Sequence, residues 1–483
     1  MEQFIEKDLE TIETLAALRS ENLVEYTLDA ELENVENKKV VIDKLLDSGK
    51  CKADSLAAVM DFIASYIFAL LKGRMLVNNY VEKSKSKQDV FLFLHTHWAV
   101  VEMQLFYVFV KRCARKMGLQ DFYCDDPDFM NKLYLRLIFK LMDYKKQKVM
   151  PGDVWVNVMN GTLEIHKDGS IELRPHSADD FFTYVLPYCY SPDAECPLWH
   201  KFLDRVMPDV EMQSLLAEFI GYCFTKNLRL EKQGIFFGTG ANGKSVTLDI
   251  ISKLLGSSNV SNVSLSSLTM DDEKRSLIEG KLANISTESG GQLDTAMLKQ
   301  LISGEPTEVR KLYVGTHTMY DIPKLFTSYN RLPSAEYTFG FFRRWILFPF
   351  KVTIPEAEQD VDLVKKLAKE LSGILNWVLA SLGGLIQRKA FSKSDVCDKA
   401  LKDYMNTSNS AMQFVAAMCE VDEGSSIKLS ELYRRYTTYC VEEDYKKIGK
   451  KNFQEIIESF GAKVSMKQNF KFYNLAIREN ADN

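Results

Sequence analysis

The stretch GTGANGKS at residues 238–245 has the residue types and spacing of a phosphate-binding loop. Its glycines permit backbone angles that let successive N–H groups point toward one phosphate, and a helix starting near Lys244 would add its positive end. Lys244 would then reach the β- and γ-phosphates, and the Ser245 hydroxyl would bind Mg²⁺. An ordinary glycine-rich turn is the alternative. The residues expected to contact a nucleotide are Gly238, Thr239, Gly240, Ala241, Asn242, Gly243, Lys244, Ser245 and Val246.

The neighbouring sequence supplies the elements that such a loop needs. The apolar run 235–237 comes directly before it and is typical of a buried strand. After it, apolar residues recur at helical spacing over 246–255, until Gly256 ends the run. The pattern therefore predicts a strand, a turn and a helix in the order that phosphate binding requires.

Two later strands end in polar residues that suit the same chemistry. KLANISTE ends in Glu288, and KLFTSYN ends in Asn330. An acid at the end of a strand beside the loop could hold Mg²⁺ and polarise the attacking water, so Glu288 and Ser245 are the expected metal ligands. Asn330 could orient that water. An acid after a strand is common, however, and Asn330 could equally cap the turn that follows.

Two arginines stand directly before a very apolar strand in FFRRWILFPF, residues 341–350. Guanidinium groups so close to an apolar strand need an anionic partner. Arg343 and Arg344 therefore either pair with carboxylates of the same chain, or one of them reaches a γ-phosphate as an arginine finger.

Composition sets broad limits. A chain of 483 residues is too long for one core, and 46% apolar with 26% charged residues is ordinary for a globular protein. No run of eighteen uncharged apolar residues occurs, and the N-terminus has no signal-peptide pattern, so we expect a cytoplasmic protein without a membrane anchor. The nine cysteines and six histidines complete no zinc pattern, which favours free thiols.

The charge is uneven along the chain. Residues 1–37 contain eleven acids and two bases, and this balance of −9 leaves +4 for the rest of a chain whose net charge is −5. A nucleic-acid partner is therefore compatible with the sequence only if local basic surfaces bind it.

We divide the chain into four regions. Residues 1–84 are acidic, with an apolar helical pattern from Leu56 to Val77, and residues 85–196 are α+β with a hairpin signal at Asp168-Gly169. The third region, residues 197–390, contains the phosphate-binding loop and is the expected ATPase domain. Residues 391–483 predict helices followed by two strands of a wing, and seven lysines fall in 445–471. This last region is interpreted as a winged-helix-like module that contacts duplex DNA or, alternatively, docks a protein.

The motifs together resemble a known family. GTGANGKS, then KLANISTESGGQLDTAMLKQLISGEPTEVRKLY, then IPKLFTSYN and FFRRWILFPF are similar in content and order to the motor of phage and plasmid primase–helicases. This family belongs to helicase superfamily three, a branch of the AAA+ ATPases. The resemblance covers roughly residues 85–475. It implies an α/β fold with an AAA+ P-loop core, a mainly helical N-terminal region, a small α+β domain and the winged-helix-like module.

The resemblance also implies a function. Members form rings, usually hexamers, that hydrolyse ATP with Mg²⁺ and pull one DNA strand through the centre. Carried over by position, Lys244 and Ser245 bind the nucleotide and Glu288 is the Walker B acid. Asn330 is the sensor, and Arg343 or Arg344 acts on the ATP of the neighbouring subunit. Two positions depart from the family pattern: Thr287 where a second acid is common, and Tyr329 where threonine is usual.

In this family a hairpin between the strands that end at Glu288 and Asn330 enters the pore. The sequence predicts such a hairpin over 309–321, with its tip at 315–317. It offers charged and stacking side chains for a single or forked DNA strand; these are Arg310, Lys311, Tyr313 and His317. A solvent-facing hairpin with an ordinary charged face is the alternative.

The sequence favours a helicase that has no primase activity of its own. Residues 1–85 lack the paired carboxylates and histidine of a catalytic primase domain, so we expect a helicase that works with a separate primase. Two other functions remain open, namely an AAA+ ATPase that remodels protein or RNA, and a nucleotide-binding scaffold that does not hydrolyse ATP.

Overall fold

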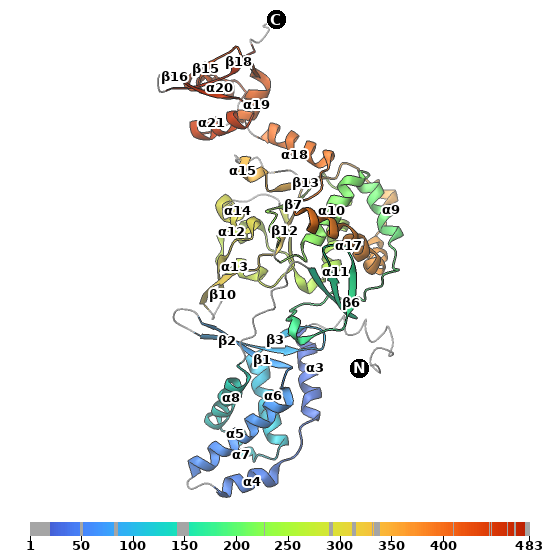
Figure 1. Cartoon of the computed structure of the whole chain (residues 1–483), viewed down its shortest axis with the longest axis vertical. Coiled ribbons are helices and arrows are strands. Elements are labelled where there is room, and N and C mark those ends of the chain that lie inside the picture. Colours follow the sequence, from blue (N-terminus) through green and yellow to red (C-terminus); the bar gives the residue numbers. More distant parts are fainter. Residues whose placement is uncertain are drawn as a thin grey trace. The chain divides into compact units, whose positions relative to one another are not determined.

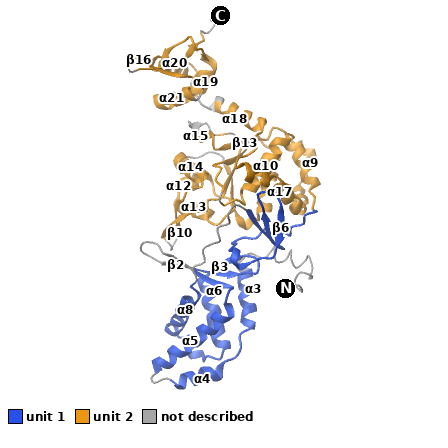
Figure 2. Cartoon of the chain, in the orientation of Figure 1, with its two compact units in different colours: residues 1–193 blue, residues 194–483 orange. Residues whose placement is uncertain are grey.

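The computed structural model describes residues 20–48, 52–81, 86–142, 154–226, 228–288, 293–311, 315–330, 332, 339–408, 410–443, 445, 447–460, 462–467 and 470–478. It is a mixed α/β structure made of many helices and several separate sheets (Figure 1). The chain divides into two compact units, Met1–Asp193 and Ala194–Asn483, which Figure 2 shows in different colours.

In its described residues, the first unit has six helices and a three-stranded antiparallel sheet ordered β1-β2-β3. The helices are α3 (Ser20–Glu33), α4 (Lys39–Ser48), α5 (Lys52–Leu71), α6 (Met103–Lys116), α7 (Asp121–Cys124) and α8 (Pro127–Leu141), and the strands are β1 (Met75–Val81), β2 (Ser86–Phe93) and β3 (Trp98–Val101). One cluster of buried apolar side chains runs from Val24 to Leu141 and joins these elements.

Helix α5 is apolar and long enough to cross a membrane by length and composition. Its side chains fit a core helix better, since Val59, Ile63 and Ile67 are fully buried in the apolar cluster of this unit. Asp61 on the same helix forms an ion pair with Lys140 at 3.0 Å. The helical pattern expected up to Val77 ends earlier, because the chain turns at Gly73, whose φ is +80°, and continues as β1.

The pairing of β1 with β2 extends across the expected boundary between residues 84 and 85. Met75 pairs with Leu92 and Val81 with Ser86, so the two strands form one hairpin across this position. The apolar cluster also includes residues from both before and after this boundary. Strands that share hydrogen bonds and a core belong to one folding unit.

A second small sheet completes the first unit. It is antiparallel, ordered β4-β5-β6, and contains β4 (Val154–Val158), β5 (Gly161–Ile165) and β6 (Ile171–Arg174), followed by the 3₁₀ turn η1 (Ala178–Asp180). The hairpin predicted at Asp168-Gly169 is confirmed, since Ile165 pairs with Ile171 and Gly169 has a φ of +86°.

The second unit is built on a five-stranded parallel sheet of order β13-β7-β12-β9-β8. Its strands are β7 (Gln233–Phe237), β8 (Val260–Ser261), β9 (Ala283–Glu288), β12 (Lys324–Tyr329) and β13 (Trp345–Pro349), and a separate hairpin consists of β10 (Thr307–Lys311) and β11 (Gly315–Met319). The helices and 3₁₀ turns around them are α9 (Pro197–Val206), α10 (Val210–Tyr222), α11 (Lys244–Leu255), η2 (Ser257–Asn259), α12 (Leu265–Met270), α13 (Asp272–Arg275), η3 (Ser276–Ile278), α14 (Thr295–Ser303), α15 (Phe339–Phe342), η4 (Glu356–Glu358), α16 (Leu363–Leu367), η5 (Ala368–Glu370) and α17 (Leu371–Arg388).

Helices cover both faces of this sheet. This explains why its strands are continuous apolar runs and do not alternate apolar with polar residues. On one face, Phe219 of α10 contacts Phe326 and Phe348, at ring-centroid distances of 4.8 and 6.4 Å. On the other face, Ile235 and Leu347 join a cluster that includes buried residues of α12 and α14. Successive strand residues thus pack into two different cores.

The C-terminal part of this unit has a core of its own. It contains α18 (Asp395–Ser408), α19 (Ser410–Met418), β14 (Cys419–Val421), β15 (Ile427–Lys428), α20 (Leu429–Glu442), α21 (Lys450–Ser459), β16 (Val464–Lys467), β17 (Phe470–Tyr473) and β18 (Leu475–Ile477). Buried residues from Ala411 to Leu475 form one apolar cluster. The helices and two wing strands predicted here are confirmed, and a third strand, β15, extends the wing to a sheet ordered β15-β17-β16.

Candidate functional site

The loop 238–245 connects β7 to α11, as the sequence predicts. Gly240, Ala241 and Gly243 have φ values of 115°, 47° and 87°, and these left-handed angles curl the backbone tightly. A Cβ at Gly238 would overlap Asn242 Nδ2 and the Phe350 carbonyl oxygen, so the loop packs too closely there for any side chain. Glycine is required at this position for space and at 240 and 243 for backbone conformation.

Strand β13 and the segment after it hold this loop in place. Phe350 N donates to the Phe237 carbonyl at 2.7 Å, and Ile354 N donates to the Ala241 carbonyl at 2.7 Å. Asn242 Nδ2 donates to the Phe350 carbonyl at 3.3 Å. Sequence reasoning missed this support, because nothing in the local pattern links residues more than a hundred positions apart.

Lys244 is buried beside uncharged oxygen atoms. Its Nζ donates to the Gly238 carbonyl and lies 3.2 Å from Asn242 Oδ1. Within the described ranges no carboxylate forms an ion pair with it. Burial lowers the pKa of Lys244 below its usual value. A buried ammonium with neutral partners, inside a loop of left-handed residues, is chemically suited to an anionic ligand such as a phosphate.

The other residues of the loop differ in how far their side chains are exposed to solvent. Ser245, the second residue of α11, and Thr239 are exposed, whereas Val246 is half-buried. An exposed hydroxyl at a helix N-terminus can reach a cation bound beside a phosphate. The residues present therefore fit a nucleotide with Mg²⁺.

The parallel sheet brings the 238–245 loop and the backbone of Glu288 and Asn330 to one edge, where the strands end. Phe237, Tyr329 and Glu288 pair in one row across β7, β12 and β9, where these strands end. At a strand spacing of about 4.8 Å, the Cα of Glu288 lies about 10 Å from that of Phe237. Gly238 N donates to the Tyr329 carbonyl at 3.3 Å, and the exposed Asn330 follows at once. The Glu288 side chain lies outside the described residues.

Arg343 and Arg344 lie at the opposite edge. Trp345, which begins β13, pairs with Gln233 at the start of β7, whereas the loop follows the end of β7. Five strand residues span about 17 Å at 3.3 Å each. Neither arginine can therefore reach the loop of its own chain by a side-chain movement.

The two arginines have different surroundings. Arg344 is 13% exposed, donates to Ser303 Oγ from Nε at 3.2 Å and from NH2 at 3.1 Å, and pairs with Glu231 at 3.1 Å. Arg343 is 58% exposed, with Glu231 at 3.5 Å. Arg344 is thus tied to its own chain, and Arg343 is the one accessible to another molecule.

The predicted hairpin is present as β10 and β11, and its two faces differ. The tip expected at 315–317 is wrong, because these residues lie in β11, where Gly315 pairs with Lys311 and His317 with Val309. Arg310 points to solvent with 58% exposure, 3.7 Å from Glu273. Lys311 and His317 instead share a carboxylate, because Glu279 lies 3.1 Å from Lys311 Nζ and 2.8 Å from His317 Nε2. Burial acts to raise the pKa of Glu279, but Lys311 and His317 outweigh it and lower that pKa. The expected contact Tyr313 lies outside the described residues.

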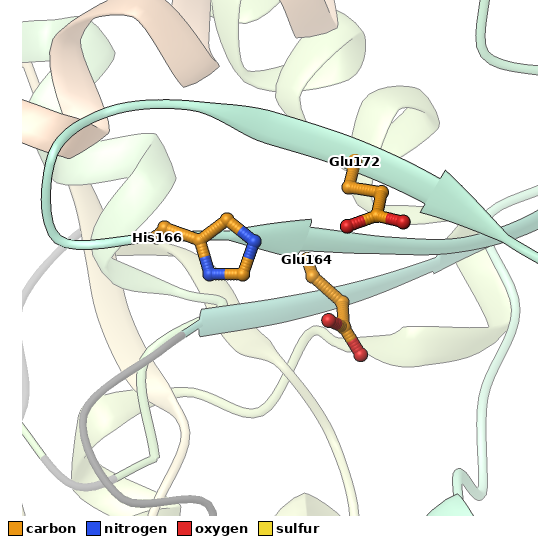
Figure 3. Close-up of side chains that lie close together, drawn as sticks. All are labelled: Glu164, His166 and Glu172. Carbon is orange, nitrogen blue, oxygen red and sulfur yellow. The ribbon is translucent and has the colours of Figure 1, made fainter.

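A separate cluster in the first unit was not anticipated. Glu164, His166 and Glu172 each place one ligand atom within 4.8 Å of the others on the β5–β6 hairpin (Figure 3). Such groups can hold a divalent cation. However, Arg174 pairs with Glu164 and lies over the Trp155 ring at 4.3 Å, so a cation there would meet an existing positive charge. We assign no metal to this cluster.

Comparisons with known proteins give three family matches in order along the chain. Residues 80–208 match a family described as D5 N terminal like. Residues 236–344 match a family of unknown function (DUF5906), and residues 406–479 match one described as Poxvirus D5 protein-like. The matches support a phage or viral primase–helicase family.

Solved structures of the NrS-1 C terminal region are also similar. An A form apo structure is 11% identical over 86% of this chain and 99% of that chain, with a TM-score of 0.44. A second apo structure, of residues 305–718, is 10% identical with the same coverage and a TM-score of 0.45. We base no residue assignment on likeness at this level.

Proposed function

We propose that this chain is an ATP-dependent DNA helicase of phage, viral or mobile-element replication. It would assemble as a ring, with six subunits expected, and move along single-stranded DNA. It would act in the cytoplasm of the host cell beside a separate primase. An AAA+ P-loop core is part of this proposal, and the family matches favour a helicase or NTPase that binds DNA.

One observation carries the proposal. The loop with Lys244, the end of β9 at Glu288 and Asn330 share one edge of the parallel sheet, and Arg343 lies exposed at the other edge. In a head-to-tail assembly, one edge of each subunit faces the opposite edge of the next. This arrangement would bring Arg343 to the nucleotide of a neighbour, which no single chain can do.

Each residue would then have a defined role. Lys244 would neutralise the β- and γ-phosphates, and Ser245 with Glu288 would hold Mg²⁺, which draws electron density from the phosphate oxygens when bound. Glu288 would also orient the attacking water, with Asn330 beside it. Arg343 would stabilise charge on the transferring phosphate from the adjacent subunit. Only one carboxylate serves the metal, because Thr287 occupies the preceding position.

The test measures ATP hydrolysis and strand separation together. Wild type should hydrolyse ATP faster with single-stranded DNA present and should unwind a labelled fork, whereas Lys244→Ala should do neither. Lys253→Ala, at an exposed position in the last turn of α11, serves as the matched control and should retain both activities. ATP hydrolysis that single-stranded DNA leaves unchanged would favour an enzyme that remodels protein or RNA. Nucleotide binding without turnover in wild type would indicate a scaffold.

A further inference from the structure

The wing sheet of the C-terminal part has one face that its helices do not cover. Residues paired across antiparallel strands point to the same side, so Lys428, Phe472 and Ser465 form one row and Phe470 with Lys467 the next. Tyr473 and Ile427 point the other way, into or against the apolar core. We call the set Lys428, Ser465, Lys467, Phe470 and Phe472 the outer face.

The outer face combines aromatic rings with positive charge. Phe470 is 50% exposed, and Lys428 Nζ lies 3.2 Å from the centre of its ring. Lys467 Nζ lies 5.7 Å from the Phe472 ring. No member of the outer face is acidic. The outer face thus carries two aromatic rings, each with an ammonium group beside it.

Nearby lysines show that this pairing is specific to the outer face. Lys463 pairs with Glu423 at 2.9 Å, and Lys471, on the opposite side of the sheet, lies 3.7 Å from Glu458. In the described part of the chain, Lys428 and Lys467 form no ion pair with a carboxylate. Their charge is therefore available to an anionic ligand.

We propose that the outer face binds single-stranded nucleic acid. A base would replace the ammonium over Phe470 and stack on the ring, and Lys428 would then bind a backbone phosphate. Phe472 and Lys467 would repeat this arrangement at the next position. Aromatic stacking requires unpaired bases, since the base faces of a duplex are covered by their neighbours. The proposal thus differs from the duplex contact expected for this module from the sequence.

Helix α21 is a weaker candidate for a duplex contact. Its exposed Lys450 and Lys451 are accompanied by exposed Glu455 and Glu458, so the charge along the helix is nearly balanced. Duplex binding depends on net positive charge against phosphates. The outer face has two lysines and no acid, which favours it over the helix.

The contact requires no ATP hydrolysis, so its test is separate from that of the proposed function. Full-length protein without nucleotide is titrated into a fluorescently labelled oligo(dT), and anisotropy is recorded at several salt concentrations. Phe470→Ala should weaken binding about tenfold, and Phe470→Trp should retain it. Lys467→Gln should weaken binding and reduce the salt slope by about one, whereas Lys463→Gln should leave both unchanged.

A crosslinking experiment does not depend on the folding of any variant. Oligo(dT) carrying bromodeoxyuridine is irradiated with the wild-type chain, and crosslinked peptides are identified by mass spectrometry. We expect crosslinks on the peptides that carry Phe470 and Phe472. Unchanged affinity in Phe470→Ala and Lys467→Gln, with no crosslinks to these peptides, would overturn the proposal. Stronger competition by a duplex than by a single strand of equal length would also overturn it.

Discussion

Oε1 of Glu279 lies 2.8 Å from Nε2 of His317 and accepts its hydrogen bond, while the other oxygen of the same carboxylate binds Lys311. One acid thus occupies two of the basic side chains expected to contact DNA. A backbone phosphate would compete with this carboxylate for the same donors.

Glu279→Gln should therefore raise the affinity for single-stranded DNA several-fold, because the amide holds Lys311 and His317 less strongly. Titration with labelled oligonucleotide measures the change, and Glu305→Gln, at an exposed position before β10, is a control with the same loss of charge. Lys311→Ala should weaken binding and flatten its salt dependence without lowering basal ATP hydrolysis. If Glu279→Gln and Lys311→Ala both leave affinity unchanged, the DNA contact lies elsewhere.

The two arginines before β13 should respond differently to substitution. Arg343→Ala should fold normally, since its side chain is exposed and contributes little to stability. It should nevertheless lose ATP hydrolysis, because Arg343 would no longer reach the nucleotide of the neighbouring subunit. Mixing it with Lys244→Ala subunits should restore part of the activity, because one interface then has both groups intact. Absence of any recovery in mixed assemblies would argue against a role between subunits.

Arg344→Ala should instead lower stability. It removes the bonds to Ser303 and Glu231 from a guanidinium that is 13% exposed, and about 1–3 kcal/mol is expected for such a loss. Thermal unfolding should show a lower midpoint for Arg344→Ala than for Arg343→Ala. Equal midpoints would mean that these bonds contribute nothing to stability.

Gly238→Ala should disrupt nucleotide binding more than its size suggests. The added methyl would overlap Asn242 and the Phe350 carbonyl, and so displace the contact that fixes the loop to β13. Gly280→Ala is a useful comparison, since its φ is +75° but no atom lies within 4 Å of the added Cβ. Binding of a fluorescent ATP analogue should fall only for Gly238→Ala.

His97 should make the first unit sensitive to acid. Burial, with a smaller effect of His176, lowers its pKa from 6.5 to about 4. An unfolded chain takes up this proton near pH 6.5 and the folded chain does not, so stability is full above that pH and falls between pH 6.5 and 4. The loss is at most about 3 kcal/mol. Urea unfolding from pH 7 to 4.5 should show this slope, and His97→Gln should reduce it.

The sequence predicted the parts of the fold that depend on local pattern. The strand, turn and helix around Lys244 and the wing strands follow from periodicity and turn residues. The hairpin expected over 309–321 does too, although its strands are Thr307–Lys311 and Gly315–Met319. The sequence did not predict strand β1 or its pairing with β2, because pairing across a polar break leaves no local pattern. Glu279, Ser303 and Phe350 were missed for a similar reason, since their partners are distant in sequence.

Strand β13 has Arg343 two residues before its first residue. Just after its last residue comes Phe350, whose carbonyl accepts from Asn242 in the 238–245 loop. Five residues of buried, paired strand are stiff along their length. In the proposed ring, this strand would mechanically couple two ATP sites. One is the ATP bound by the subunit's own 238–245 loop, and the other is the neighbouring subunit's ATP, which Arg343 would contact. ATP bound at one subunit interface would then change the activity at the next interface, and the rate of ATP hydrolysis should rise sigmoidally with ATP concentration.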